Sequence, residues 1–207
     1  EAYDASDTEN DNIAIGYRAM SADTAGGIRN IAIGNYAGDA ITSGDDNTLL
    51  GHTAGGAINS GVSNTFIGQE AGLTTNTGSS NTAVGNLALR LNATTDDNTA
   101  VGRSALAANV ADGNTAVGRS ALTANTTGTE NVAVGHSALA TNTTTNRNTA
   151  VGYASLTANV AANNTAVGYG ALNANSTGAD NIAVGYGAAE LNTTGTRNIA
   201  IGANAYN

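Results

Sequence analysis

Short apolar triplets recur along the chain, each preceded by asparagine and followed by glycine, and their commonest form is Asn-Thr-Ala-Val-Gly. The motif begins at twelve asparagines that stand 16 to 18 residues apart, namely Asn12, Asn30, Asn47, Asn64, Asn81, Asn98, Asn114, Asn131, Asn148, Asn164, Asn181 and Asn198. Self-similarity at a fixed short period is typical of a solenoid, in which each repeat completes its core only when a neighbour stacks on it. The pattern therefore predicts about twelve stacked coils.

Each triplet predicts a short strand. When a repeat is numbered from its asparagine, position 2 is Thr, Ile or Val, position 3 is Ala except at Leu49 and Phe66, and position 4 is Val, Ile or Leu. Such runs favour strands, whereas the repeats lack the 3.6-residue stripe of an amphipathic helix. Because both faces of the triplet are apolar, we expect one face to line the coil interior and the other to pack on a further surface.

The remaining columns predict a narrow coil. Glycine occupies position 5 in all twelve repeats, and alanine occupies position 8 in eleven. Seventeen residues allow about two short strands and two turns, which makes a flattened β-roll with little room inside. Position 9 is glycine at Gly38, Gly55 and Gly72 and leucine in the six repeats from Leu89 to Leu172, so the second strand is expected to gain a packing residue there. The asparagines of position 1 are expected to bond from coil to coil.

Composition excludes several classes of function. The 207 residues include no Cys, Pro, Trp or Lys, and the formal net charge is −9. Disulfides and sulfur-ligated metals are therefore excluded, and nucleic acid is an unfavourable partner. No apolar run approaches the roughly eighteen residues of a membrane helix, and residues 1–4 lack the features of a signal peptide. We expect no membrane insertion by this segment and no cofactor.

The motifs resemble the head repeats of YadA-like trimeric autotransporter adhesins and similar repeats of bacteriophage tail fibres. The resemblance rests on Asn-Ile-Ala-Ile-Gly-x-x-Ala and on Asn-Thr-Ala-Val-Gly-Tyr-Gly-Ala-Leu, and it covers residues 12–205. It implies an all-β, left-handed parallel β-roll, three chains about one axis, and an adhesive or fibrous role outside the cell or on a virion. Residues 1–11 are then a partial first coil, and residues 12–207 form the solenoid with an incomplete last coil.

Positions 2 and 4 predict the surface for self-association, because they form an apolar ribbon that a monomer in water would rarely expose. The candidate assembly residues are Ile13, Ile15, Val117, Val134, Ile199 and Ile201. Both ends of the sequence stop at the same phase of the repeat, which also predicts end-to-end stacking into a filament as an alternative.

Position 6 is the candidate ligand-binding column. In-register stacking is expected to align Arg103, Arg119, His136, Tyr153, Tyr169 and Tyr186. Aromatic rings and guanidinium groups suit sugars or anions, so a glycan or a host-surface receptor is the expected ligand. The five Asn-x-Thr sequons at position 12 are possible glycosylation sites, at Asn92, Asn125, Asn142, Asn175 and Asn192.

Other functions are less favoured by the sequence. The acidic pairs Asp45-Asp46 and Asp96-Asp97 lack the pattern of calcium-binding β-rolls, and no metal site is expected. No Ser-His-Asp set or paired-carboxylate cleft indicates an enzyme. A threonine column suggests ice binding, but each threonine alternates with aliphatic residues. That column contains Thr48, Thr65, Thr82, Thr99 and Thr115.

Overall fold

The computed structural model describes residues 11–22 and 26–206, and its regular secondary structure in these ranges consists of three-residue parallel strands. The chain divides into two compact units, Glu1–Ser104 and Ala105–Asn207. The first unit contains β1 (Ile13–Ile15), β2 (Ile31–Ile33), β3 (Thr48–Leu50), β4 (Thr65–Ile67), β5 (Thr82–Val84) and β6 (Thr99–Val101). The second contains β7 (Thr115–Val117), β8 (Val132–Val134), β9 (Thr149–Val151), β10 (Thr165–Val167), β11 (Ile182–Val184) and β12 (Ile199–Ile201).

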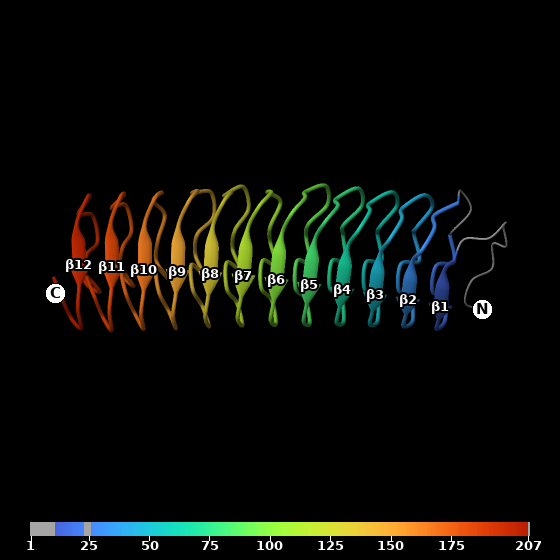
Figure 1. The fold of residues 1–207 in the computed structure, drawn as a ribbon, viewed down its shortest axis with the longest axis horizontal. Helices are drawn as coiled ribbons and strands as arrows, with labels where there is room; N and C mark the ends of the chain where they lie inside the picture. The colour runs from blue at the N-terminus through green and yellow to red at the C-terminus, as the bar shows by residue number, and fades with distance from the viewer. Residues whose placement is uncertain (1–10, 23–25, 207) are drawn as a thin grey trace. The chain divides into compact units, whose positions relative to one another are not determined.

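The strands of each unit follow sequence order in a parallel sheet, one strand per coil (Figure 1). Equivalent positions pair with one another, so that Thr149 lies beside Thr165 and Ala150 beside Ala166. This register confirms the predicted all-β parallel solenoid. It also explains why each column of the sequence has one character, since every residue stacks on its own equivalent. The predicted partial coil at residues 1–11 lies almost entirely outside the described residues.

The invariant glycine ends each strand. All twelve adopt φ values between 123° and 143°, a range that side chains rarely allow. The glycine of one coil also lies directly against the glycine of the next, and a Cβ added at Gly68 would be 2.6 Å from the Gly85 carbonyl oxygen. Glycine is therefore required both for the backbone conformation and for the close approach of the coils.

The prediction of a second strand in each coil is wrong. In the described residues, the side opposite the strand is a series of turns, in which positions 7 and 9 have positive φ. Leu87 and Leu89 show this alternation, with φ of 60° and 51°. Coil-to-coil hydrogen bonds still satisfy the backbone, because the Leu122 amide donates to the Ala138 carbonyl at 3.0 Å. The leucines of position 9 do pack inside, as expected, although they stand in a turn.

The core is filled from opposite sides in different coils. Ala133 and Leu139 are fully buried and represent the pattern of the later coils, with a small residue at position 3 and a large one at position 9. Coil three reverses the sizes: buried Leu49 occupies position 3, and a Cβ added at Gly55 of position 9 would lie 2.8 Å from Leu49 Cδ2. In these coils a large side chain from one side of the interior faces a small residue on the other, which is the close-packed arrangement expected of a protein core.

A ladder of buried asparagines runs along position 1, as predicted. Asn64 Nδ2 donates to Asn47 Oδ1 at 3.0 Å and to the Gly78 carbonyl at 2.9 Å. The Asn64 amide also donates to Asn47 Oδ1, at 3.0 Å. Each side chain therefore joins three successive coils, and buried polar groups of this kind stabilise a fold only while every partner is present.

Replacing Ala133 with leucine is expected to lower the free energy of unfolding by about 1–3 kcal/mol, because the interior already holds Leu139 and has no space for a second large side chain. Denaturant unfolding measures the loss. The double variant Ala133→Leu/Leu139→Gly copies the size pattern of Leu49 and Gly55 and should recover part of it. Unchanged stability of the single variant would contradict the inward orientation of position 3.

Candidate functional site

The outward face of the sheet carries an aliphatic column at position 4 and a column of threonine and aliphatic residues at position 2. Positions 2 and 4 point away from the core, and position 4 is aliphatic in every coil. Ile13 and Ile15 are 49% and 58% exposed, and Ile199 and Ile201 are 70% and 71% exposed. Val117 is also exposed, whereas Val134 is half-buried. The six predicted assembly residues therefore lie on the sheet face of their units. The isoleucines of β1 and β12 are more exposed than the two valines.

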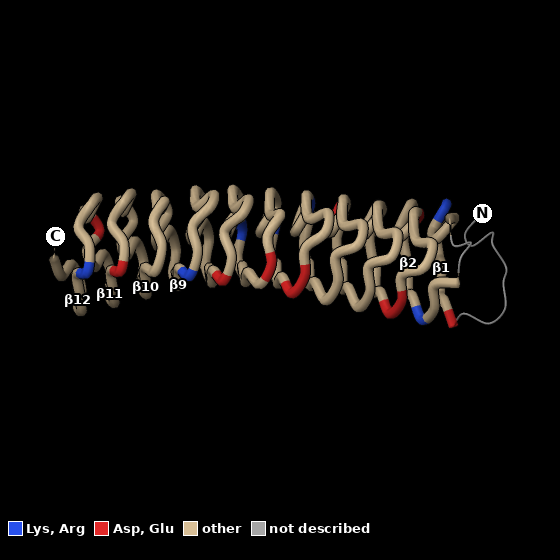
Figure 2. The backbone as a smooth tube through the Cα atoms, turned by 90° about the horizontal axis from the view of Figure 1, so that it is seen from above, with Lys and Arg blue, Asp and Glu red and all other residues tan. Residues whose placement is uncertain are grey.

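Many of the charged residues stand in the turns that lead into the strands, where Figure 2 shows them spaced along the backbone. Asp45 accepts a hydrogen bond from the Ile28 amide at 2.9 Å, and Asp96 accepts one from the Ser79 amide at 2.7 Å. These carboxylates therefore accept hydrogen bonds from the backbone of the neighbouring coil. Among the described residues, no three His, Asp or Glu side chains come together in a group able to hold a metal ion.

One ion pair joins coils in this turn. Arg29 Nε donates to Asp46 Oδ1 at 2.6 Å, and this hydrogen bond holds the pKa of Asp46 below its usual value. Both side chains are about half exposed, so the pair contributes little to stability. Burial raises the pKa of the Asp39 carboxyl, although the positive charge of Arg18 acts in the opposite direction.

The aromatic column of position 6 forms a stacked ladder in the second unit. The ring centroids of His136 and Tyr153 are 5.2 Å apart, those of Tyr153 and Tyr169 are 5.0 Å apart, and those of Tyr169 and Tyr186 are 5.3 Å apart. The planes of successive rings differ by 7° to 12°. Four of the six predicted ligand residues are thus brought together, with the faces of the inner rings occupied by their neighbours.

The two arginines of the predicted column are placed differently. Arg119 is exposed and stands one coil before His136, since its carbonyl accepts from the Ser137 amide at 3.0 Å. Arg103 is exposed and belongs to the first unit. Ring-to-ring stacking therefore defines a ladder from His136 to Tyr186, with Arg119 adjoining it along the backbone.

The first unit contains a smaller aromatic group that the column analysis missed. Tyr17 and Tyr36 meet edge to face at 5.5 Å, and Tyr36 contacts His52 at 6.2 Å. Arg18 lies 5.7 Å from the centre of the Tyr36 ring. Tyr36 stands at position 7 rather than position 6, so a search for ladders within one column does not find it.

The five sequon asparagines are inside the coil. Their side chains are almost fully buried at position 12, and two further asparagines without the sequon, Asn109 and Asn159, are buried in the same column. Asn125 Nδ2 donates to Asn109 Oδ1 at 2.7 Å and to the Gly128 carbonyl at 2.9 Å. The column is a second asparagine ladder, and a glycan on any of these nitrogens would require the turn to open. The structure therefore does not support Asn92, Asn125, Asn142, Asn175 or Asn192 as glycosylation sites of the folded chain.

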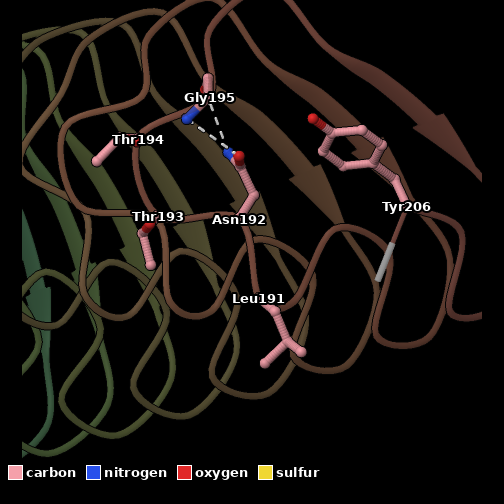
Figure 3. Close-up of a pocket in the computed structure, with 6 residues that line it drawn as sticks. All are labelled: Leu191, Asn192, Thr193, Thr194, Gly195 and Tyr206. Atoms are coloured by element: carbon pink, nitrogen blue, oxygen red, sulfur yellow. Dashed lines mark hydrogen bonds between the residues drawn. The ribbon is translucent and has the colours of Figure 1, made fainter.

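A shallow depression of about 330 Å³ lies beside the last coils and is lined by Leu191, Asn192, Thr193, Thr194, Gly195 and Tyr206 (Figure 3). Asn192 holds its floor by bonding both the amide and the carbonyl of Gly195, at 3.1 and 3.2 Å. None of the six lining residues is a histidine or a carboxylate, and Tyr206 is the one titratable side chain among them. The threonines of the proposed ice-binding column are half-buried on the sheet face.

The fold defines a parallel β-solenoid repeat protein. No protein-family model matches the chain, and neither curated proteins nor solved structures include a significant match to it. Within residues 11–22 and 26–206, no helix has the length and apolar character needed to cross a membrane.

Proposed function

We propose that the chain is a non-enzymatic structural segment of an extracellular fibre, which associates with further copies of itself through the sheet face and contacts a surface or receptor with its side columns. The observation that carries the proposal is the aliphatic column at position 4. The coil interior is complete without these side chains, since alanine, leucine and asparagine fill it. Their outward exposure is therefore not explained by the folding of a single chain.

Further copies of the same chain would cover the sheet face. Burying one valine or isoleucine side chain fully is worth about 1.5–3 kcal/mol, and the column repeats that gain in every coil. Copies of the same chain have the same coil spacing, so a sheet face on one copy matches the face of another along its length. The resemblance to adhesin heads and phage fibres favours three copies about one axis.

End-to-end stacking into a filament is the second candidate. Such stacking would cover Ile199 and Ile201 of β12, which are each about 70% exposed. A strand whose backbone is open on one side pairs readily with a strand of another chain. In that assembly, the amide hydrogens of β12 would exchange slowly with solvent.

The double variant Val117→Asp/Val134→Asp is expected to dissociate or unfold the assembly, because carboxylates would be buried in an apolar interface. Val160→Asp is the matched control, since Val160 is 47% exposed but lies outside the strands. Size-exclusion chromatography with light scattering should show a lower mass, or loss of the folded species, only for the double variant. Equal masses for both variants and the unmodified chain would remove the sheet face from the proposed interface.

A further inference from the structure

The aromatic ladder of the second unit has one open face. Tyr153 and Tyr169 are stacked on both sides, and each is about half exposed. Tyr186 stacks on Tyr169 with one face, while the next coil places Ala203 at the equivalent position. The Asn204 amide donates to the Tyr186 carbonyl at 2.8 Å, so this coil follows in the same register. A methyl group covers much less of a ring than a second tyrosine would, and Tyr186 is 60% exposed.

Two polar side chains lie close to Gly187, the residue that follows Tyr186. A Cβ added at Gly187 would lie 2.6 Å from Asn204 Oδ1 and 3.2 Å from Glu190 Oε2, so both oxygens lie over the residue that follows Tyr186. The other carboxylate oxygen, Glu190 Oε1, would be 3.6 Å from a Cβ at Gly170, one coil earlier. Because Gly170 and Gly187 have no side chains, they leave space for the Asn204 amide and the Glu190 carboxylate. Any larger residue at Gly187 would displace them.

This combination suits a sugar ring. The C–H face of a pyranose is apolar and packs on an aromatic ring, while its hydroxyl groups require acceptors and donors at the edge of that ring. A carboxylate accepts hydrogen bonds from hydroxyls, and an amide both donates and accepts. An anionic ligand is disfavoured, because Glu190 is acidic and the chain carries a formal charge of −9.

We propose that the outer face of Tyr186, with Asn204 and Glu190 at its edge, binds a neutral hexopyranose. The stacked rings of Tyr169 and Tyr153 hold Tyr186 in place, so little side-chain freedom is lost when the sugar binds. This sugar would be the ligand in the surface or receptor contact of the proposed function, and the inference rests on that function only for this link. A single ring platform with two polar partners is expected to bind a monosaccharide with a Kd on the order of 1 mM.

Saturation-transfer NMR tests the site, with the methyl glycosides of glucose, galactose, mannose and N-acetylglucosamine as probes. At least one probe should receive saturation at its ring C–H protons from the unmodified protein. The signal should vanish in Tyr186→Ala, which removes the platform, and in Ala203→Tyr, which keeps Tyr186 but continues the ladder over its open face. Tyr17→Ala removes a tyrosine of similar exposure from the first unit and should leave the signal unchanged.

Thermal melting and solution mass of every variant establish that the fold and the association state are retained. If Tyr186→Ala fails to fold, Ala203→Tyr alone decides the question, because it adds a ring to an existing stack. The absence of transfer to all four probes, or equal transfer to the unmodified protein and Ala203→Tyr, would overturn the proposal. Either result would leave self-association untouched, since that is read from mass and needs no sugar.

Discussion

Replacing Gly168 with alanine is expected to lower the free energy of unfolding by about 2–6 kcal/mol, a large part of the roughly 5–15 kcal/mol that stabilises an ordinary domain. Two costs add. The residue has φ of +139°, which strains any side chain, and the new methyl group would lie 2.6 Å from the Gly185 carbonyl carbon. Neither coil is able to move away, because the backbone hydrogen bonds of β9, β10 and β11 hold their spacing. Denaturant unfolding followed by circular dichroism measures the loss.

Gly170→Ala is the matched control, two residues further along the same coil. Gly170 also has a positive φ, of 64°, but its nearest neighbour beyond the adjacent residues would be Glu190 Oε1 at 3.6 Å, an ordinary contact. Its equivalent in the preceding coil is Ala154, which adopts φ of 52°. The control should therefore lose only about 1–2 kcal/mol. Similar losses for the two variants would mean that the close approach of the position 5 glycines is not what limits the coil spacing.

Replacing Asn131 with alanine is expected to cost about 2–5 kcal/mol, because several buried hydrogen bonds lose a partner at once. Asn131 Oδ1 accepts from the Asn148 amide at 3.0 Å and from Asn148 Nδ2 at 3.3 Å. Asn131 Nδ2 donates to Asn114 Oδ1 at 3.2 Å and to the Thr145 carbonyl at 2.8 Å. Groups in three coils are left unsatisfied, and thermal unfolding should show the effect as a lower melting temperature.

Asn86→Ala provides the comparison. Asn86 stands on the surface column at position 6, and its Nδ2 makes only long contacts with Gln69, at 3.4 and 3.5 Å. Its loss should change the stability by no more than about 0.5 kcal/mol. An equal effect at Asn131 and Asn86 would show that the ladder adds nothing beyond an ordinary surface asparagine.

The sequence predicts the strands and the inner columns because parallel stacking places each residue on its own equivalent. A column of alanine at position 3 or of asparagine at position 1 therefore reports one environment repeated in every coil. The opposite side of the coil was not predictable in this way. Its turns place Leu89, Ser104 and other ordinary residues at positive φ, and such residues carry no local signal for that conformation.

At the candidate site, too, one part was predictable from the sequence and another was not. The alignment of His136, Tyr153, Tyr169 and Tyr186 follows from the register alone, but the mutual stacking that covers the inner faces depends on side-chain rotamers. The sequons were misleading because Asn-x-Thr describes a short segment rather than a column. The signal against them was present in the sequence, since Asn109 and Asn159 continue the same column with no threonine two residues later.

Sedimentation equilibrium of the unmodified chain tests self-association most directly. We expect a particle of three times the 20.3 kDa mass of one chain, with the mass unchanged on moderate dilution. A heterogeneous distribution of much larger particles would favour end-to-end stacking instead. A stable, monodisperse particle of 20.3 kDa would contradict the account, because the aliphatic sheet face would then be exposed to water in the working form of the protein.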